Sequence, residues 1–304
     1  MVTLQDLVIA TTQRLTSAGI PADEARTEAR LLLQHAFGLT REQLILRSDS
    51  PIDGGQGAIL EPLLVRRANR EPLPYILGER GFYGLSFRVT PAVLIPRPET
   101  ELLVEAALNP LREAGEGRRL SGGERQGEER HILDIGTGSG CIAITLAKLL
   151  PGTLVWATDI SEEALDVAKE NASRHGATVE FCLGDLLAPL PPDLCFSVIV
   201  SNPPYIAPAD AETLEPEVGV FEPHLALFDP ISGSDGLTLY RRLASEAPAR
   251  LTNGGWLMVE VGQGQAEAVA QLFADAGLTA IEVREDLAGI PRVVLAQKSG
   301  LDRT

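Results

Sequence analysis

The segment Asp-Ile-Gly-Thr-Gly-Ser-Gly at residues 134–140 restricts the fold of this 304-residue chain more than any other. It overlaps the end of a short apolar run at residues 132–135 and precedes an apolar stretch of helical character at residues 141–150. Glycines at such a turn let the backbone approach a ligand closely, and the N–H groups at the start of the following helix point toward that ligand. A strand, a glycine-rich turn and a helix in this order predict an α/β fold that binds a ligand at the end of its sheet.

The same alternation of short apolar strands and helical stretches continues along the rest of the chain. It predicts parallel strands joined by helices that cover both faces of the sheet. The last two strands are joined by a short loop and must therefore be antiparallel to each other. We expect a Rossmann-like, mostly parallel seven-stranded sheet with an antiparallel last strand. Its strands are expected at residues 132–135, 154–158, 179–183, 196–201, 256–261, 280–284 and 292–297, and its helices at residues 141–150, 162–175, 237–251 and 265–276.

Residues 1–72 have a different pattern, in which apolar side chains recur at helical spacing. Gly38 stands where a helix would end, and Thr40 and Gln43 have the spacing of a capping box that starts the next helix. The pattern predicts a small helical bundle that forms a domain of its own.

The remaining chain divides into a linker and a larger domain. Residues 73–97 contain a β-rich stretch with glycine and proline punctuation, and they are expected to form a β-hairpin linker. Residues 98–304 then form the α/β domain. Within it, residues 112–130 contain five Gly and ten charged side chains, which predicts a flexible loop.

Composition excludes several classes of protein. The chain has 26 Lys and Arg against 42 Asp and Glu, a formal net charge of −16, whereas proteins that bind a nucleic acid duplex usually carry a basic surface. No apolar run approaches the ~20 residues of a membrane-spanning helix, and the first residues do not resemble a secretion signal. The three Cys and four His have neither disulfide-framework nor metal-ligand spacing. We expect a cytoplasmic protein, with no bound metal, that acts on a protein or a small molecule.

The glycine segment also indicates which ligand is bound. The dinucleotide fingerprint G-x-G-x-x-G would need a glycine at position 141, where Cys141 stands. The form D-x-G-x-G-x-G resembles instead the S-adenosylmethionine loop of class I methyltransferases. This resemblance implies that Gly136, Thr137, Gly138, Ser139 and Gly140 hold the cofactor; the alternative is a plain strand-to-helix turn.

Two aspartates follow the next two predicted strands. Asp159 ends the second strand, where a carboxylate can accept hydrogen bonds from both ribose hydroxyls of a nucleoside; the alternative is an N-cap for the next helix. Asp185 follows the third strand, at the place where such enzymes contact the adenine edge; the alternative is a turn residue. Both are candidate cofactor-binding residues.

The tetrapeptide Asn202-Pro203-Pro204-Tyr205 follows the fourth predicted strand. Two successive prolines stiffen the backbone and remove two N–H donors, which leaves carbonyl groups that accept hydrogen bonds. The side-chain carbonyl of Asn202 and the main-chain carbonyl of Pro203 could hold both N–H bonds of an amide or amine nitrogen, and Tyr205 could pack on its planar group. These four residues are the candidate catalytic and substrate-binding residues; the alternative is a strand-terminating turn.

Together with these motifs, longer segments resemble the HemK/PrmC family, the N5-glutamine methyltransferases of peptide chain release factors. The segments are Pro74-Tyr-Ile-Leu-Gly78, Gly81-Phe-Tyr-Gly84, Leu94-Ile-Pro-Arg-Pro-Glu-Thr-Glu-Leu-Leu-Val104, Asn202-Pro-Pro-Tyr-Ile206, Phe221-Glu-Pro223, Ala226-Leu227 and Asp235-Gly-Leu237. The resemblance implies a class I methyltransferase fold that uses S-adenosyl-L-methionine and releases S-adenosyl-L-homocysteine.

The resemblance also implies the substrate and the roles of the domains. Residues 1–72 would help dock a class-1 release factor, whose Gly-Gly-Gln glutamine would lie on Asn202, Pro203, Pro204 and Tyr205. Leu186 and Asn202 would join the glycine loop and the two aspartates in the cofactor site. We expect a monomer. Three alternatives are a glutamine methyltransferase of a large-subunit ribosomal protein, a nucleobase N-methyltransferase and a non-catalytic cofactor-binding protein.

Overall fold

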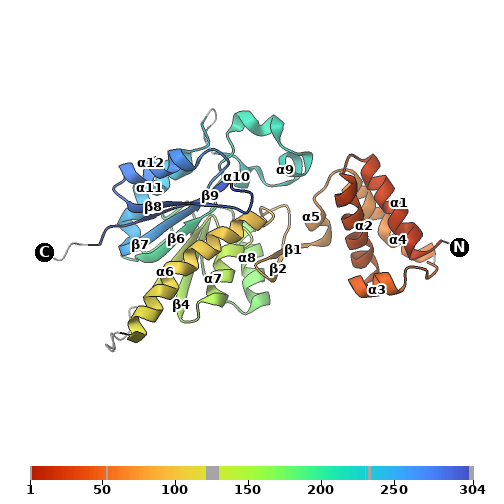
Figure 1. Cartoon of the computed structure of the whole chain (residues 1–304), viewed down its shortest axis with the longest axis horizontal. Coiled ribbons are helices and arrows are strands. Elements are labelled where there is room, and N and C mark those ends of the chain that lie inside the picture. Colours follow the sequence, from red (N-terminus) through yellow and green to blue (C-terminus); the bar gives the residue numbers. More distant parts are fainter. Residues whose placement is uncertain (1, 53, 121–129, 230, 232–233, 301–304) are drawn as a thin grey trace. The chain divides into compact units, whose positions relative to one another are not determined.

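A computed structural model of the chain describes residues 2–300 except 53, 121–129, 230, 232 and 233. The chain divides into two compact units (Figure 1). The first contains residues 1–79 together with residues 215–221, and the second contains residues 80–214 and 222–304. Among the described residues, no helix is both long enough and apolar enough to span a bilayer.

The first unit is the predicted helical bundle. Its helices are α1 (Leu4–Ser17), α2 (Ala22–Phe37), α3 (Arg41–Leu46), α4 (Gly54–Ala68) and α5 (Leu73–Leu77), joined from later in the chain by α9 (Pro216–Phe221). The local structure confirms the predicted signals. Gly38 ends α2 with φ 62°, and Thr40 and Gln43 form a reciprocal capping box at α3. The bundle core contains apolar side chains that include Leu15, Ala29, Leu32 and Leu60.

The first unit differs in two ways from the predicted domain at residues 1–72. It continues past residue 72 because α5 adds the buried side chains of Leu73 and Ile76 to the same core. It also includes residues 215–221, which no local sequence pattern assigned to it. The predicted hairpin linker begins only after α5, as strands β1 (Glu79–Phe82) and β2 (Leu85–Arg88).

The second unit is built on one seven-stranded sheet, as predicted. Its strands are β3 (Arg130–Ile135), β4 (Thr153–Asp159), β5 (Glu180–Leu183), β6 (Phe196–Ser201), β7 (Leu251–Glu260), β8 (Thr279–Glu285) and β9 (Pro291–Gln297). They lie in the order β5-β4-β3-β6-β7-β9-β8. The pairs from β5 to β7 are parallel, and β9 is antiparallel to both of its neighbours.

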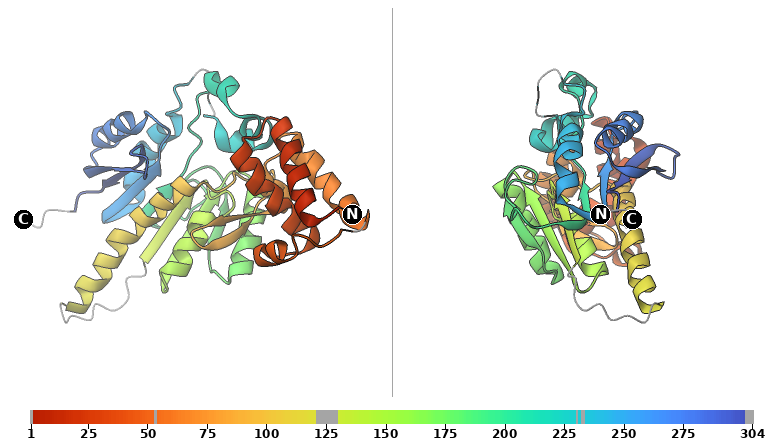
Figure 2. Two further views of the ribbon diagram at one scale, coloured as in Figure 1. Left: turned by 45° about the vertical axis from the view of Figure 1, so that its right-hand side comes forward. Right: turned by 90° about the vertical axis from the view of Figure 1, so that its left-hand side faces the viewer.

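Helices cover both faces of this sheet (Figure 2). Helices α6 (Glu101–Leu120), α7 (Cys141–Leu149) and α8 (Glu162–His175) pack on one face, and α11 (Thr238–Arg250) and α12 (Ala266–Asp275) pack on the other. Alternating strand residues enter the two cores: Val293 and Leu295 lie in one, and Val294 and Ala296 in the other. Burial on both faces explains the continuous apolar runs in these strands.

The structure corrects the prediction of a flexible loop at residues 112–130. Helix α6 continues through Leu120, residues 121–129 lie outside the described residues, and Arg130 begins β3. Once a helix has formed, each further residue is added at little free-energy cost, and the Arg, Glu, Ala and Leu of this stretch are good helix formers. The charge and glycine content of the segment hid this continuation.

Three short helical segments between β6 and α11 were not predicted. They are η2 (Pro208–Thr213), α9 and α10 (His224–Leu227), and a further short one, η1 (Pro98–Thr100), leads into α6. None is long enough to show a helical repeat of apolar residues.

Candidate active site

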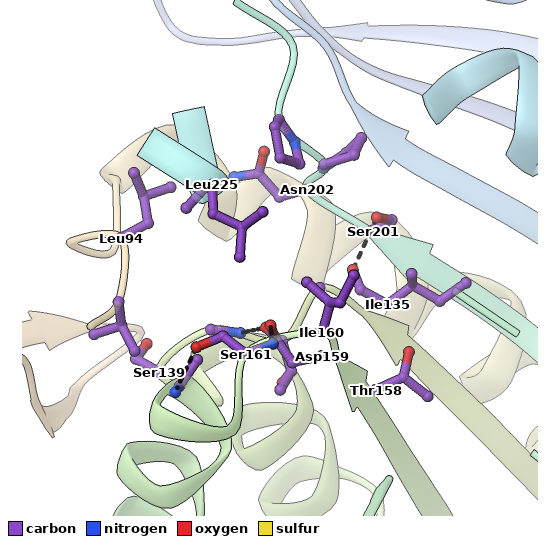
Figure 3. A pocket seen from close by; sticks show the side chains of 18 of the residues that line it. Leu94, Ile135, Ser139, Thr158, Asp159, Ile160, Ser161, Ser201, Asn202 and Leu225 are labelled. Atoms are coloured by element: carbon purple, nitrogen blue, oxygen red, sulfur yellow. Dashed lines mark hydrogen bonds between the residues drawn. The ribbon is translucent and has the colours of Figure 1, made fainter. Parts of the chain in front are cut away.

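A cavity of about 320 Å³ lies in the second unit at the carboxyl ends of β3, β4 and β6. This is where open α/β sheets bind ligands, and the volume is within the usual range for a small-molecule site. Figure 3 shows Asp159 and Ser161 on one side of the cavity and Asn202 across from them. Leu94 and Leu225 line it from segments outside the sheet.

The glycine loop forms one wall of the cavity. The backbone N–H groups of Gly136 and Thr137 donate to the Thr158 carbonyl at 2.8 and 3.0 Å, which ties the loop to the neighbouring strand. Gly136 and Gly138 have φ of 72° and 54°, and a Cβ built on either meets no atom within 4 Å. Because both residues line the cavity, side chains there would enter the space that a ligand needs.

Gly140 has a different role from the one predicted. It is not among the residues that line the cavity, and its Cβ would lie 2.8 Å from the Ile144 side chain and 3.2 Å from that of Ala168. It serves the close packing of α7 against α8. Thr137 and Ser139, in contrast, both line the cavity as predicted.

The carboxylates of Asp134 and Asp159 hold the glycine loop in place through hydrogen bonds. The Asp134 carboxylate accepts from the Thr137 hydroxyl at 2.7 Å and from the Ala143 N–H at 3.2 Å, and its burial raises its pKa to about 7. Asp159 accepts from the Gly138 N–H at 2.8 Å and the Ser161 N–H at 2.9 Å. Burial raises the pKa of Asp159 as well. Asp159 is among the residues that line the cavity, and each of its oxygens can accept a further hydrogen bond.

Asp185 and Leu186 line the cavity at the end of β5. The Arg242 guanidinium, also in the lining, donates to the Asp185 carboxylate at 3.0 Å. Leu186 is buried against the core formed with α11 and α12, and it adopts a positive φ of 46°.

The tetrapeptide after β6 divides between the cavity and the core. Asn202, Pro203 and Pro204 line the cavity. Tyr205 does not: its ring packs against the core beside α11 and α12, and burial raises the pKa of its hydroxyl to about 12. The Tyr205 carbonyl accepts from the Gln265 side chain at 3.0 Å. The structure therefore gives Tyr205 an anchoring position rather than a place in the cavity wall.

Comparison with known proteins identifies the family. The family model for the PrmC N-terminal domain matches residues 6–78, and that for the methyltransferase small domain matches residues 123–215. The release factor glutamine methyltransferase of Geobacter sulfurreducens is 46% identical over 90% of this chain and 89% of its own. The enzyme of the same name from Koribacter versatilis is 40% identical over 97% of this chain and 99% of its own. The chain belongs to the release factor glutamine methyltransferase family.

One solved structure is named as a protein-(glutamine-N5) methyltransferase, release factor-specific, from Alicyclobacillus acidocaldarius. It is 32% identical, covers 70% of this chain and 99% of its own, and has a TM-score of 0.40. The matches extend across both units of this member of the release factor glutamine methyltransferase family.

Two segments that carried the family resemblance meet at the cavity of this methyltransferase. The Arg97 side chain, which lines the cavity, pairs with the buried carboxylate of Glu222, and Glu222 also accepts from the Ile95 N–H at 3.1 Å. Burial raises the pKa of Glu222, against the opposing effect of Arg97. No local pattern in the sequence relates Arg97 to Glu222, because 125 positions separate the two residues.

A second missed group lies behind Asn202. The Asn202 amide nitrogen donates to the Thr100 hydroxyl at 3.3 Å, and both side chains lower the pKa of Glu260, which lies at the end of β7. Thr100 and Glu260 are each 3% exposed. The sequence carried one signal for this group: Glu260 is a charged residue within the apolar run predicted as a strand at residues 256–261. Charged side chains are rarely buried without a partner, so a partner was to be expected.

The residues that line the cavity suit a nucleoside that carries an amino acid. Carboxylates at Asp159 and Asp185 can accept from hydroxyl and amine groups, and apolar side chains at Ile135, Ile160 and Leu186 can contact a planar ring. The open positions beside Gly136 and Gly138 leave room for the rest of the molecule. Cys141 also lines the cavity, but burial raises the pKa of its thiol to about 12, so it is not a nucleophile at neutral pH.

Proposed function

We propose that this protein methylates the side-chain amide nitrogen (N5) of the glutamine in the Gly-Gly-Gln motif of class-1 peptide chain release factors, with S-adenosyl-L-methionine as methyl donor. Its relatives at 40–46% identity are named for release factor glutamine methylation, and a solved relative is named for the N5 position. The product of the cofactor would be S-adenosyl-L-homocysteine.

One observation carries this proposal: Asn202 and Pro203 line the same cavity as Asp159 and the glycine loop. The side-chain carbonyl of Asn202 and the main-chain carbonyl of Pro203 are acceptors, and prolines at 203 and 204 remove the donors that would compete. Two such acceptors would hold both N–H bonds of a primary amide. Fixing the orientation of a weak nucleophile in this way is a recognised source of rate enhancement.

The residues that would hold S-adenosyl-L-methionine follow from the lining. Asp159 would accept from the ribose hydroxyls, Asp185 from the exocyclic amine of adenine, and Leu186 would contact the ring. Gly136, Thr137, Gly138 and Ser139 would enclose the amino-acid part. The bound cofactor supplies a methyl group on a positively charged sulfur, so the protein needs no metal and no strong base.

We also propose a role for the helical unit and a place of action. The first unit would help dock the release factor, because the family model that matches it belongs to the same methyltransferases. The protein would act as a monomer in the cytoplasm and contribute to translation termination through this modification.

The test is mass spectrometry of a purified class-1 release factor after incubation with this protein and S-adenosyl-L-methionine. We expect one added methyl group on the Gly-Gly-Gln peptide, and none on a factor whose motif glutamine is changed to alanine. The variant N202A should bind the cofactor within a few-fold of wild type but turn over ~10²–10³-fold more slowly, the scale for one positioned hydrogen-bond partner.

Two results would contradict the proposal. An unmodified release factor, in the presence of intact cofactor binding, would exclude this substrate. Wild-type turnover by N202A would exclude Asn202 from the mechanism.

A further inference from the structure

Glu260 is a buried carboxylate that the proposed reaction does not use. It ends β7, is 3% exposed and lies next to β6, the strand that leads into Asn202. The parallel register pairs Ser201 with Val259, so Asn202 and Glu260 are the next residues on the two strands. The topology of the sheet therefore brings this carboxylate beside the amide that faces the cavity.

Two residues that line the cavity, Thr100 and Asn202, lie close enough to Glu260 for their side chains to lower its pKa. One of its oxygens, Oε2, is buried without a hydrogen-bond partner among the described residues. Burial raises the pKa of Glu260 to about 7; its hydrogen bonds and Arg292 oppose the shift, and Glu99 adds to it. A carboxylate in this position destabilises the fold, because removing a charge from water is unfavourable when its hydrogen bonds are incomplete.

The chemistry of the three side chains fixes how the amide must lie. Above its pKa of about 7 the Glu260 carboxylate is ionised and only accepts hydrogen bonds, so the group of Asn202 that faces it there is the NH2. The same NH2 donates to the Thr100 hydroxyl, which in turn can donate to Glu260. The amide oxygen of Asn202 is then held at the opposite end, away from the carboxylate.

We infer that Glu260 is a positioning residue that fixes the orientation of the Asn202 amide, so that Asn202 presents its oxygen and not its NH2 to the substrate. The inference rests on the proposed function for its catalytic consequence. Without the carboxylate the amide could rotate by half a turn, because its oxygen and nitrogen are nearly equal in size. The rotated amide would direct N–H bonds at the N–H bonds of the substrate amide and would not hold it.

The variant E260Q tests this inference, because glutamine keeps the shape of the side chain but can donate as well as accept. We expect kcat for the release factor to fall ~10–100-fold, less than the ~10²–10³-fold for losing a positioned hydrogen-bond partner because Asn202 itself remains, with cofactor affinity within a few-fold of wild type. Thermal stability should be retained or increased, since a buried charge is removed. The control is T145V, an isosteric change at another buried hydroxyl of the same unit that has no hydrogen-bond partner among the described residues.

A double variant separates positioning from a merely structural role. If Glu260 acts through Asn202, E260Q combined with N202A should turn over no more slowly than N202A alone. Wild-type kcat for E260Q would overturn the inference. So would a double variant in which the two effects multiply.

A measurement without substrate keeps this test separate from that of the proposed function. The side-chain NH2 resonances of Asn202, assigned by their absence in N202A, should exchange with solvent at least tenfold faster in E260Q than in wild type. Equal exchange rates would overturn the inference even if the release factor is methylated. Faster exchange in a protein that leaves the release factor unmodified would contradict only the proposed function.

Discussion

Asp134 and Glu260 each bury one carboxylate oxygen without a hydrogen-bond partner among the described residues. Burial raises both pKa values to about 7. The folded state therefore holds these protons at pH values where the unfolded chain has lost them. Stability from the two groups is fully present at acidic pH and is lost as the pH rises toward and through 7.

The direction of this pH dependence of stability gives a prediction for E260Q. At pH 8 the variant removes a buried negative charge and should raise the midpoint of thermal unfolding by roughly 2–6 °C. At pH 5 the wild-type group is already protonated, so the two proteins should unfold within about 1 °C of each other. Calorimetry at both pH values checks this, with E285Q on the exposed face of β8 as control. An equal difference at both pH values would contradict it.

A second prediction at this scale concerns Asp159. The variant D159A should weaken cofactor binding by ~1.5–3 kcal/mol, the range for hydrogen bonds to a charged group, or about 10–150-fold. It also removes the acceptor for the Gly138 and Ser161 N–H groups, so titration calorimetry should be run well below its unfolding temperature. D286A, outside the cavity lining, is the control. Unchanged affinity would remove Asp159 from the site.

The turn after β6 is held in place by Gln265 at the start of α12. Gln265, the N-cap of α12, accepts from the Gly262 N–H at 3.0 Å and donates to the Tyr205 carbonyl at 3.0 Å. Gly236 closes over the same carbonyl: a Cβ built there would lie 2.3 Å from the Tyr205 oxygen. The position of Asn202 and Pro203 thus depends on two segments that are distant in sequence.

We therefore expect G236A to displace the turn. It should lower kcat at least tenfold and lower stability by about 1–3 kcal/mol, through both the clash and its positive φ of 78°. G254A is a matched control, because its φ is 76° and its Cβ would meet only one atom, at 3.9 Å. G254A should lose stability through strain alone and keep its kcat. Equal kcat values for the two variants would show that Gly236 does not hold the turn.

At the scale of elements, sequence periodicity predicted the helices and strands whose structure is determined by local interactions. Helix α8 occupies residues 162–175 as expected, and six of the seven strands lie within two residues of their expected bounds, whereas β7 begins five residues before the expected residue 256. The glycine loop, Asp159 and Asn202 follow from the ends of those strands, and the structure brings them to one cavity. The segments between β6 and α11 were missed because tertiary contacts, not periodicity, determine their structure.

The missed site residues have the same explanation. Thr100 and Glu260 lie 160 positions apart, and Arg97 and Glu222 lie 125 apart, so no spacing in the sequence relates them. Gly140 and Tyr205 belong to the motifs but are not among the residues that line the cavity, because motif membership does not specify which atom faces a ligand. Gly140 is required by helix packing, and Tyr205 by the core.

At the scale of the whole molecule, α9 links the two units along the chain. It lies between the Asn202–Tyr205 turn and the Glu222 segment, yet it clusters with the helical unit. There the Glu217 carboxylate accepts from Arg67 at 2.9 Å and from Arg70 at 2.6 Å, and Arg67, only 2% exposed, also pairs with Glu28 at 2.7 Å. Burial would raise the pKa of Glu217, but the two arginines outweigh it and lower the pKa.

The variant E217Q should therefore destabilise the helical unit, with a pH dependence opposite to that of E260Q. At pH 7 we expect a loss of ~1.5–3 kcal/mol, the range for a hydrogen bond to a charged group. The loss should disappear as the pH falls through the lowered pKa of Glu217, because a carboxyl group with a lowered pKa contributes no stability below it. Denaturant titration at several pH values checks this, with E215Q on the same segment as control. A loss that does not depend on pH would contradict the ion-pair account.

The membership of α9 in the helical unit limits how this protein can be recombined. The backbone passes between the two units after residues 79, 214 and 221, so the helical unit is not one continuous stretch of sequence. A fragment that ends at residue 79 would leave Arg67 and Arg70 without their Glu217 partner. A chimera that exchanges the helical unit with that of a relative must therefore exchange residues 215–221 as well.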